Sequence, residues 1–514
     1  MSKTIIIIGA GLAGLSAALQ AAENGCNVKL VSSLPSERAQ SVMAEGGINA
    51  ALNTKDENDS PEEHFTDTIK AACGLADPNA VWGMTQAAPE LVHWLLKLGV
   101  KFNISGYDDV DLRNFGGQKK KRTAFAQSDT GKQIMTAMID AVRRKEASGM
   151  VERFSHHSFL TLRLCGNICC GCVIRDEYSQ ETVELPGDAV IVATGGMHGL
   201  FGNTTGSLSN TGEVTAELFR LGVPLANGEM IQYHPTTVKC GGKRMLISEA
   251  ARGEGGRLFA MKDGKQWYFM EEKYPELGNL MPRDITAREI WKVSHESEVF
   301  LDMTEISEEI ISNKLSGLAD DCMTYLHKDI RKEPVSVLPG IHYFMGGILV
   351  DEQHRTPIQN LCAAGECCAQ YHGANRLGGN SLLGALYGGR VAAKSACEQA
   401  DVVDLSCATQ IDFPPASQIS EIKQLNKVMQ ETMGVVRNEN TLLNGIQTVQ
   451  ALTGNLPLLG MAVLKSALAR KESRGAHWRE DYPKSNDDDY LKTTVARFDG
   501  KQIQISFVPV PERR

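Results

Sequence analysis

The first 32 residues contain the feature that most constrains the fold of this chain. Residues 4–8, TIIII, form the continuous β-branched run expected of a parallel strand that is buried on both faces. GAGLAG comes next, followed by a helical pattern that ends at Gly25 and by a second strand-like run, NVKLVS. This order predicts the first strand, turn, helix and strand of a dinucleotide-binding sheet.

The glycines of the turn each have a physical role in such a site. Gly9 makes the turn, Gly11 lets a pyrophosphate approach the backbone, and Gly14 lets the helix and strand pack closely. The first amides of the helix then face the phosphates. The glycine pattern alone is a weak signal, but it becomes strong between a buried strand and a helix. An acidic residue often ends the second strand; Ser32 stands there, so other residues must recognise the ribose.

Later segments extend this pattern along a chain of 514 residues, which is long enough for two to four domains. Two further strand-like runs end in glycine, AVIVATGG and LCAAGE, and mixed helical and loop-like segments separate them. We therefore predict an α/β fold with an inserted domain. Its expected elements are helices at about 62–75, 80–98 and 130–148, a hairpin-like segment at 99–125, strands across 151–193, and helices from about 417 to 474.

Charge and hydropathy exclude several roles. The net charge of -9 gives little support to nucleic-acid binding, and we interpret the one basic cluster, Lys119 to Arg122, as a solvated loop tip. No apolar run approaches the ~20 residues that span a bilayer, and MSKTIIIIGAG has too short an apolar run for a signal peptide. We expect a cytoplasmic protein.

Thirteen cysteines in a cytoplasmic chain of this length do not indicate a disulfide framework. The densest group is CGNICCGC, which contains Cys165, Cys169, Cys170 and Cys172. Its flanks alternate as in a β-hairpin with Gly-Asn at the turn, and no second CxxC pair completes a metal site with the usual spacing. Strand cysteines are the preferred interpretation, and a metal site is the alternative.

Five segments combine histidine or arginine with glycine, proline or small residues. Each histidine, taken singly, has a structural interpretation, and Arg252 has two carboxylates nearby with which to pair, Glu249 and Glu254. Together the segments supply more cationic donors than a structural role needs, and arginine binds a carboxylate with two parallel hydrogen bonds. If they converge, they suit a small dianion. The segments are QYHPTT, SEAARGEGG, MPRDITAR, GIHYFMGG and HGANRLGGNSL.

These motifs, in this order, resemble the fumarate reductase/succinate dehydrogenase flavoprotein family, whose superfamily includes L-aspartate oxidase. SVMAEGGINAAL, FGGQKKKRTAFAQSDTG and ESRGAHWREDYP extend the resemblance over nearly the whole chain. It implies FAD in a Rossmann-like domain of residues 1–230 and 341–405, with an inserted α+β capping domain at 231–340. It also implies a C-terminal helical domain with a short tail at 415–514, and an active site at the junction of the first two domains.

The resemblance assigns FAD contacts to residues from many segments. Glu366 would bind ribose or ribityl hydroxyls, and Ser381 and Leu382 would lie beside the isoalloxazine. The family stretch TGDG reads TGEV here, so the carboxylate is kept as Glu213 with a longer side chain. The full implied set is Gly9, Ala10, Gly11, Gly14, Ser32, Ser41, Gly46, Gly47, Ala193, Thr194, Gly195, Glu213, Glu366, Ser381 and Leu382.

The same resemblance assigns the substrate site. Arg283 matches the arginine that delivers a proton to the substrate, and Glu249 and Arg252 match the relay that supplies that proton. The resemblance also implies that the substrate is bound by His234, Ser248, His342, Arg376 and Phe115. Ser248 replaces the more usual threonine and keeps a hydroxyl. No metal ligand is implied.

Two positions distinguish this chain from its relatives. Aspartate oxidases have glutamate where Phe115 stands, and tend to have cysteine at Met345, so a dicarboxylate without an amine fits better. Membrane-bound family members have a histidine at the place of Gln40, which bonds covalently to the flavin. Glutamine cannot form that bond, so we expect non-covalent FAD and a preference for fumarate reduction. The alternative is that Gln40 is a loop residue away from the ring.

The resemblance leaves the electron donor open. ESRGAHWREDYP is similar to the segment of relatives that work with an iron–sulfur subunit, so such a partner is expected over a free-standing enzyme, with the membrane reached only through partners. The expected activity is fumarate reduction to succinate. The alternatives are succinate oxidation, L-aspartate oxidation, reduction of another unsaturated acid, and a non-enzymatic FAD-binding subunit.

Overall fold

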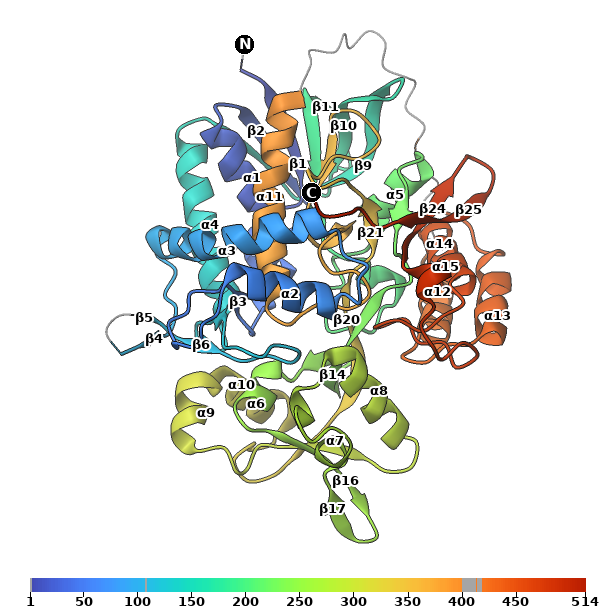
Figure 1. Cartoon of the computed structure of the whole chain (residues 1–514). Helices are drawn as coiled ribbons and strands as arrows, with labels where there is room; N and C mark the ends of the chain where they lie inside the picture. The colour runs from blue at the N-terminus through green and yellow to red at the C-terminus, as the bar shows by residue number, and fades with distance from the viewer. Residues whose placement is uncertain (1, 107–108, 400–412, 414–417) are drawn as a thin grey trace.

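The computed structural model describes residues 2–106, 109–399, 413 and 418–514 (Figure 1). Its central sheet has five parallel strands in the order β22-β12-β1-β2-β8. β22 joins this sheet after the long insertion, which confirms the predicted interrupted α/β order. The strands are β1 (Thr4–Ile8), β2 (Asn27–Ser32), β8 (Val151–Ser155), β12 (Ala189–Val192) and β22 (Leu361–Ala363).

The isoleucines of β1 require a layer on each face of the sheet, because successive residues of a strand point to opposite faces. Ile5 and Ile7 enter a core shared with helices on one face, whereas Ile6 and Ile8 enter a second core with the antiparallel sheet β11-β10-β9. The helices of the first core include α1 (Leu12–Glu23), α4 (Thr130–Ala147) and α11 (Asn380–Gln399) (Figure 1).

Two more helices, α2 (Pro61–Ala71) and α3 (Pro78–Leu98), each begin with a capping side chain followed by proline. Ser60 caps α2 and Asp77 caps α3 through hydrogen bonds from first-turn amides. With α4 they confirm the three predicted helices. Within the described ranges, no helix combines the length and apolarity needed to cross a bilayer.

The predicted hairpin around CGNICCGC is confirmed. β9 (His157–Cys165) and β10 (Ile168–Asp176) pair antiparallel, and β11 (Thr182–Pro186) pairs with β10. Cys169 and Cys172 are buried in the second core. Across the part of the chain that the structure describes, no group of three or more His, Cys, Asp or Glu is arranged to hold a metal ion.

The prediction of a solvated loop tip at Lys119 to Arg122 is wrong for its last residue. Lys119 and Lys121 are exposed, but Arg122 is fully buried. Its guanidinium lies 2.8 Å from a carboxylate oxygen of Asp59 and 2.9 Å from one of Asp67. The two carboxylates compensate the charge that leaves water, and both lie far from Arg122 in sequence.

A second lobe, drawn below the central sheet in Figure 1, contains most of residues 231–344 and has its own core. Its two sheets have the orders β15-β14-β20 and β17-β16-β18-β19. The strands are β14 (Ile231–Cys240), β15 (Lys243–Leu246), β16 (Arg257–Lys262), β17 (Lys265–Trp267), β18 (Val299–Asp302), β19 (Val335–Ser336) and β20 (Leu338–Phe344). The helices include α6 (Glu249–Gly253), α7 (Phe269–Lys273), α8 (Arg283–Val293), α9 (Glu308–Lys314) and α10 (Ser316–Asp321).

The C-terminal region begins with three helices, α12 (Ile419–Thr432), α13 (Glu439–Val449) and α14 (Asn455–Ala469). The chain then forms β24 (Lys492–Phe498) and β25 (Ile503–Pro509). β24 pairs with β13 (Leu225–Ala226), which also pairs with β21 (Gly347–Leu349). The short C-terminal tail implied by the resemblance is therefore part of a mixed sheet. The domain boundaries drawn from the sequence stay a prediction.

Candidate active site

A cavity of about 1070 Å³ is lined by residues of both the central sheet and the second lobe. This volume lies at the upper end of the ~300–1,000 Å³ typical of small-molecule sites. The wall follows the carboxyl ends of β1, β2, β12 and β22, where open parallel sheets bind their ligands. The cavity therefore joins a nucleotide-type site to the second lobe.

The turn between β1 and α1 can lie against the sheet because it contains glycine. Gly9 has a φ of 110°, and a Cβ on it would lie 2.2 Å from the carbonyl oxygen of Ala193. A Cβ on Gly14 would lie 1.8 Å from the carbonyl oxygen of Gly9, so Gly14 serves helix–strand packing and is absent from the cavity wall. Gly11 has no side chain to cap α1, which leaves first-turn amides for an anion.

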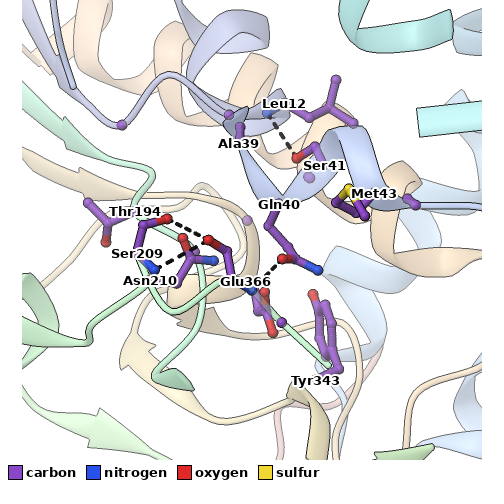
Figure 2. A pocket seen from close by; sticks show the side chains of 18 of the residues that line it. Leu12, Ala39, Gln40, Ser41, Met43, Thr194, Ser209, Asn210, Tyr343 and Glu366 are labelled. Atoms are coloured by element: carbon purple, nitrogen blue, oxygen red, sulfur yellow. Dashed lines mark hydrogen bonds between the residues drawn. The ribbon is translucent and has the colours of Figure 1, made fainter. Parts of the chain in front are cut away.

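The segment from Arg38 to Gly47 forms another wall of the cavity (Figure 2). Ser41 Oγ accepts a hydrogen bond from the Leu12 amide at 3.2 Å, which ties this segment to α1. A Cβ on Gly46 would lie 2.9 Å from the Phe115 ring. A Cβ on Gly47 would lie 2.5 Å from the carbonyl oxygen of Ala124, so neighbouring protein atoms leave no room for a side chain at either glycine.

Gln40 lies on the cavity wall, and Figure 2 shows it projecting from the turn that contains Ser41 and Met43. Its Oε1 accepts a hydrogen bond from the amide of Ser207, a residue that also lines the cavity. Gln40 therefore lines the same cavity as the predicted cofactor residues, and its place beside the flavin ring stays a prediction.

The other predicted cofactor residues lie on the same cavity wall. Glu366 Oε1 accepts a hydrogen bond from the Phe344 amide at 3.1 Å. Glu213 begins α5 (Glu213–Arg220), and burial together with Glu217 raises the pKa of its carboxyl group. Backbone amides, hydroxyls and carboxylates along one long cavity fit a dinucleotide such as FAD. The remaining wall residues of the set are Ala10, Ser32, Gly47, Ala193, Thr194, Gly195, Ser381 and Leu382.

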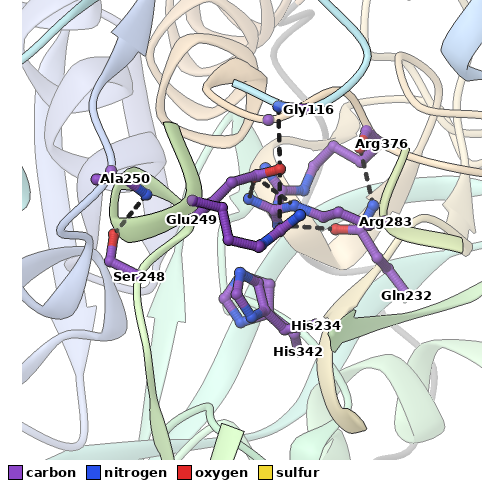
Figure 3. A network of polar contacts seen from close by, with 12 residues as sticks. Gly116, Gln232, His234, Ser248, Glu249, Ala250, Arg283, His342 and Arg376 are labelled. Carbon is purple, nitrogen blue, oxygen red and sulfur yellow. Dashed lines mark hydrogen bonds and ion pairs between the residues drawn. The ribbon is translucent and has the colours of Figure 1, made fainter. Parts of the chain in front are cut away.

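Two buried arginines flank Glu249 in the second lobe (Figure 3). One oxygen of Glu249 accepts from Arg283 Nε at 2.8 Å and from Nη2 at 2.5 Å. The other oxygen accepts from Arg252 Nη2 at 3.3 Å and from the Gly116 amide at 3.1 Å. Burial alone would raise the pKa of Glu249, but Arg283 and Arg252 hold it below its ordinary value. Arg283 and Glu249 line the cavity, whereas Arg252 lies behind them.

His234 and His342 face each other beside this ion pair, with ring centroids 5.1 Å apart (Figure 3). His342 Nδ1 is hydrogen-bonded to Thr205 Oγ1 at 2.8 Å, and His234 Nδ1 lies 3.1 Å from the Thr236 carbonyl oxygen. Burial, with Arg283 nearby, holds the pKa of each histidine well below its usual value. Both rings are therefore neutral in the free site at neutral pH.

Arg376 and Ser248 complete the cluster on the cavity wall. The Arg376 guanidinium lies over the Tyr343 ring, 4.4 Å from its centroid, and its buried Nε has no hydrogen-bond partner among the described residues. Burial and the nearby Arg283 lower the pKa of Arg376 to about 9, so it remains cationic at neutral pH. A cation with an unused donor beside a cavity is suited to an anionic ligand.

The structure brings in residues that the sequence did not indicate. Buried Gln232 accepts from Arg283 Nη1 at 3.1 Å and donates to the Arg376 carbonyl oxygen at 2.8 Å, so it joins both arginines. Glu45 lines the cavity, and burial, with Asp321 nearby, raises the pKa of its carboxyl group to about 8. Gln232 stands two residues before His234 in the same strand, and this position was the sequence feature that could have indicated it as a site residue.

Comparison with known families agrees with this arrangement. A family model described as "FAD binding domain" matches residues 4–382, and one described as "Fumarate reductase flavoprotein C-term" matches residues 452–513. Together these two matches cover most of the chain, including the glycine-rich turn, the cationic cluster and the C-terminal strands.

Individual relatives match over nearly their whole length. The chain is 38% identical to the succinate dehydrogenase flavoprotein subunit of Bacillus subtilis, covering 100% of this chain and 98% of that one. It is 32% identical to the 8-methylmenaquinol:fumarate reductase flavoprotein subunit of Wolinella succinogenes, covering 100% and 92%.

A solved structure of a mutant of the FrdA chain of E. coli quinol fumarate reductase superimposes with a TM-score of 0.90 at 27% identity, covering 99% of this chain and 97% of that one. Fold, cavity and relatives agree over the full length. The chain therefore belongs to the FAD-binding fumarate reductase/succinate dehydrogenase flavoprotein family and is an FAD-dependent oxidoreductase of that type.

Proposed function

We propose that this chain reduces fumarate to succinate as the flavoprotein subunit of a fumarate reductase. The observation that supports this most directly is the cationic cluster around the cavity, in which Arg283 and Arg376 lie beside the neutral pair His234 and His342. Two arginines and two imidazoles offer donors to both carboxylates of a small dianion. Phe115 is buried there and carries no charge to meet a substrate ammonium.

In this proposal FAD lies along the cavity without a covalent bond. The first turn of α1 binds the pyrophosphate, Glu366 binds hydroxyls of the ribose or ribityl chain, and Ser381 and Leu382 lie beside the ring. When bound, the flavin supplies the hydride that one alkene carbon accepts. Gln40 on the cavity wall has no ring nitrogen with which to bond the flavin, and the loss of that bond favours reduction over oxidation.

The chain's own residues then bind the substrate and move the proton. His234, His342 and Arg376 hold the two carboxylates, with the Ser248 hydroxyl as a further donor. Arg283 gives its proton to the second alkene carbon, and its hydrogen bonds to Glu249 and Gln232 fix the direction of the guanidinium. Arg252, behind Glu249, continues the path by which the proton returns. The donors also stabilise charge that develops on the substrate carboxylate.

An iron–sulfur subunit is proposed as the electron-transfer partner. The motif ESRGAHWREDYP, residues 472–483, contains Glu472, His477 and Arg479, which are fully buried. Glu472 pairs with Arg470 at 2.7 Å and with Arg474 at 2.8 Å, so the motif shapes the C-terminal region internally. Exposed residues at its end, such as Glu480, remain for a partner. Any contact with a membrane then goes through that partner.

The test is anaerobic. The purified protein is reduced chemically, and flavin reoxidation is followed after addition of fumarate, iminoaspartate or other unsaturated acids. Rapid reoxidation by fumarate alone supports the proposal. If the flavin stays reduced with fumarate but is reoxidised by another unsaturated acid, the fold assignment holds and the proposal of fumarate as the substrate is overturned.

Succinate oxidation is the second candidate, and the similarity to a relative named succinate dehydrogenase at 38% identity favours it. Initial rates in both directions, with one artificial electron carrier at a fixed potential, distinguish the two. Faster fumarate reduction supports the leading proposal, and faster succinate oxidation supports the second.

A further inference from the structure

Cys26 and Cys397 are in contact at the edge of the nucleotide-type domain. Their Sγ atoms lie 3.1 Å apart, although the residues are separated by most of the chain. Cys26 stands in the connection between α1 and β2, and Cys397 lies in the last turn of α11. Cys26 is 5% exposed and Cys397 is partly exposed, so the pair is packed but reachable from solvent.

The three elements that meet at this pair also reach the cavity at their other ends. α1 begins at the glycine turn with Leu12, β2 ends at Ser32, and the first turn of α11 contains Ser381 and Leu382. The sulfur pair therefore joins the far ends of the elements whose near ends form the cofactor site. α1 and α11 also share one hydrophobic core, so the two helices keep the thiols together.

Neighbouring contacts hold both residues in place. Lys3 Nζ donates to the Cys397 carbonyl oxygen at 2.7 Å, and the Cys26 amide donates to the Ala21 carbonyl oxygen at 3.0 Å. The two sulfur atoms must approach by about 1 Å to reach the ~2.05 Å of a disulfide bond.

We propose that Cys26 and Cys397 form a reversible disulfide when the protein meets hydrogen peroxide, and that this bond slows the loss of FAD. One thiolate attacks a peroxide oxygen and the O–O bond breaks. This step forms a sulfenic acid on that cysteine and releases one water. The second sulfur attacks the first, the S–O bond breaks, and a second water leaves as the S–S bond forms. Two thiols are oxidised by two electrons in all, and one peroxide is reduced to two waters.

The expected reaction is slow at neutral pH. Burial, together with the hydrogen bond between the two thiols, in which Cys397 keeps its proton, raises the pKa of Cys397 to about 12, so this thiol is protonated under ordinary conditions. The pair then responds to sustained oxidation rather than to a brief pulse. A bond between residues 26 and 397 closes a very long loop in the unfolded chain, which is where a cross-link restricts unfolding most.

The test uses the FAD-loaded full-length protein. One sample is treated with hydrogen peroxide and one with dithiothreitol; thiols are then blocked with N-ethylmaleimide, and peptides are analysed without reduction. The expected result is a linked pair of peptides containing Cys26 and Cys397, lighter than the two free peptides by two hydrogens and absent after dithiothreitol. In the same samples, FAD release during mild urea treatment is followed by flavin fluorescence and is expected to be several-fold slower after oxidation.

Two variants control the interpretation. Cys397→Ser removes the pair, so oxidation must produce neither the linked peptide nor slower release. Cys322→Ser changes a buried cysteine of the second lobe and must leave both effects unchanged. If both Cys26 and Cys397 still carry N-ethylmaleimide after peroxide treatment, the proposed disulfide has not formed and the proposal is overturned. A linked peptide with unchanged FAD release, or slower release that persists in Cys397→Ser, overturns its effect on the cofactor.

Discussion

Arg283 donates two hydrogen bonds to one oxygen of Glu249, from Nε at 2.8 Å and from Nη2 at 2.5 Å, and both side chains are buried. Its remaining nitrogen, Nη1, donates to Gln232. All three nitrogens are thus engaged before any substrate enters, so the guanidinium does not have to be ordered at the moment of reaction. A group held in this way is suited to deliver a proton in one direction.

Arg283→Gln is expected to lower fumarate reduction by about 10²–10⁴-fold, because the proposed proton donor is lost while the neighbouring amide and carboxylate remain. Arg283→Lys keeps the charge but not the planar fork that meets Glu249, so it should recover only a small part of the rate. Stopped-flow reoxidation of the reduced flavin measures both. FAD content and the unfolding temperature serve as controls, and a variant with normal FAD and near-normal rate contradicts the assignment.

The flavin of the wild-type protein is expected to separate from the chain on acid precipitation, since Gln40 offers no imidazole nitrogen for a covalent bond. All of the yellow colour should remain in the supernatant, and the protein band on a denaturing gel should show no flavin fluorescence. Gln40→His is the informative variant, because it supplies the imidazole nitrogen that glutamine lacks. Fluorescence on the wild-type band would refute non-covalent binding.

Acid is expected to destabilise the free protein partly through His234. Burial, with Arg283 and His342 nearby, holds its pKa well below 6.5, whereas the unfolded chain binds a proton near that value. The unfolded state then binds more protons below pH 6.5, so the free energy of unfolding falls by up to about 1.4 kcal/mol per pH unit from this one group. Above pH 7 the effect vanishes.

Urea titrations between pH 7.5 and 5.5 measure this loss. His234→Gln should flatten the fall below pH 6.5 relative to wild type. The exposed residue His295 provides a matched control, and His295→Gln should keep the wild-type slope. If His234→Gln loses stability as steeply as wild type, His234 is protonated in the folded protein and the pKa direction is wrong.

Arg122→Leu is expected to reduce the free energy of unfolding by about 3–5 kcal/mol, because it leaves the carboxylates of Asp59 and Asp67 buried without their partner. The neighbouring change Lys121→Ala, at an exposed position, should shift it by less than about 0.5 kcal/mol. Urea midpoints give both values. Equal effects from the two substitutions would show that Arg122 contributes no more than a surface residue.

Local patterns in the sequence predicted the elements and the glycine turn of the cofactor wall, and the family resemblance supplied the other wall residues. The TIIII run, the glycine turn and the helices that follow Ser60 and Asp77 depend on residues close together in the chain, and parallel strands bring their carboxyl ends to one edge. Gly9 and Ser32 therefore lie where the pattern placed them. The convergence of His234, Arg283 and Arg376, which spacing could not prove, is observed in the structure.

Contacts between distant segments could not be predicted from the sequence. Arg122 was interpreted as solvated because no residue near it in the chain indicates its partners, Asp59 and Asp67. Gln232 is an ordinary polar residue until the fold places it between Arg283 and Arg376. Likewise, Glu45 has an altered pKa only because folding buries it near Asp321. Each depends on tertiary packing, which local residue preference does not encode.

The pairing of β13 with β24 has a consequence for how the chain is made. Ala226 lies opposite Val495, so the short strand leaves the ribosome 269 residues ahead of its partner (495 minus 226). At about 5–20 residues per second, its partner arrives roughly 10–60 s later. Until then one edge of β13 is unpaired, and the sheet that joins β13 and β21 to β24 closes only after residues 492–498 have been made. A nascent chain that stops early therefore lacks this closure and is exposed to proteases.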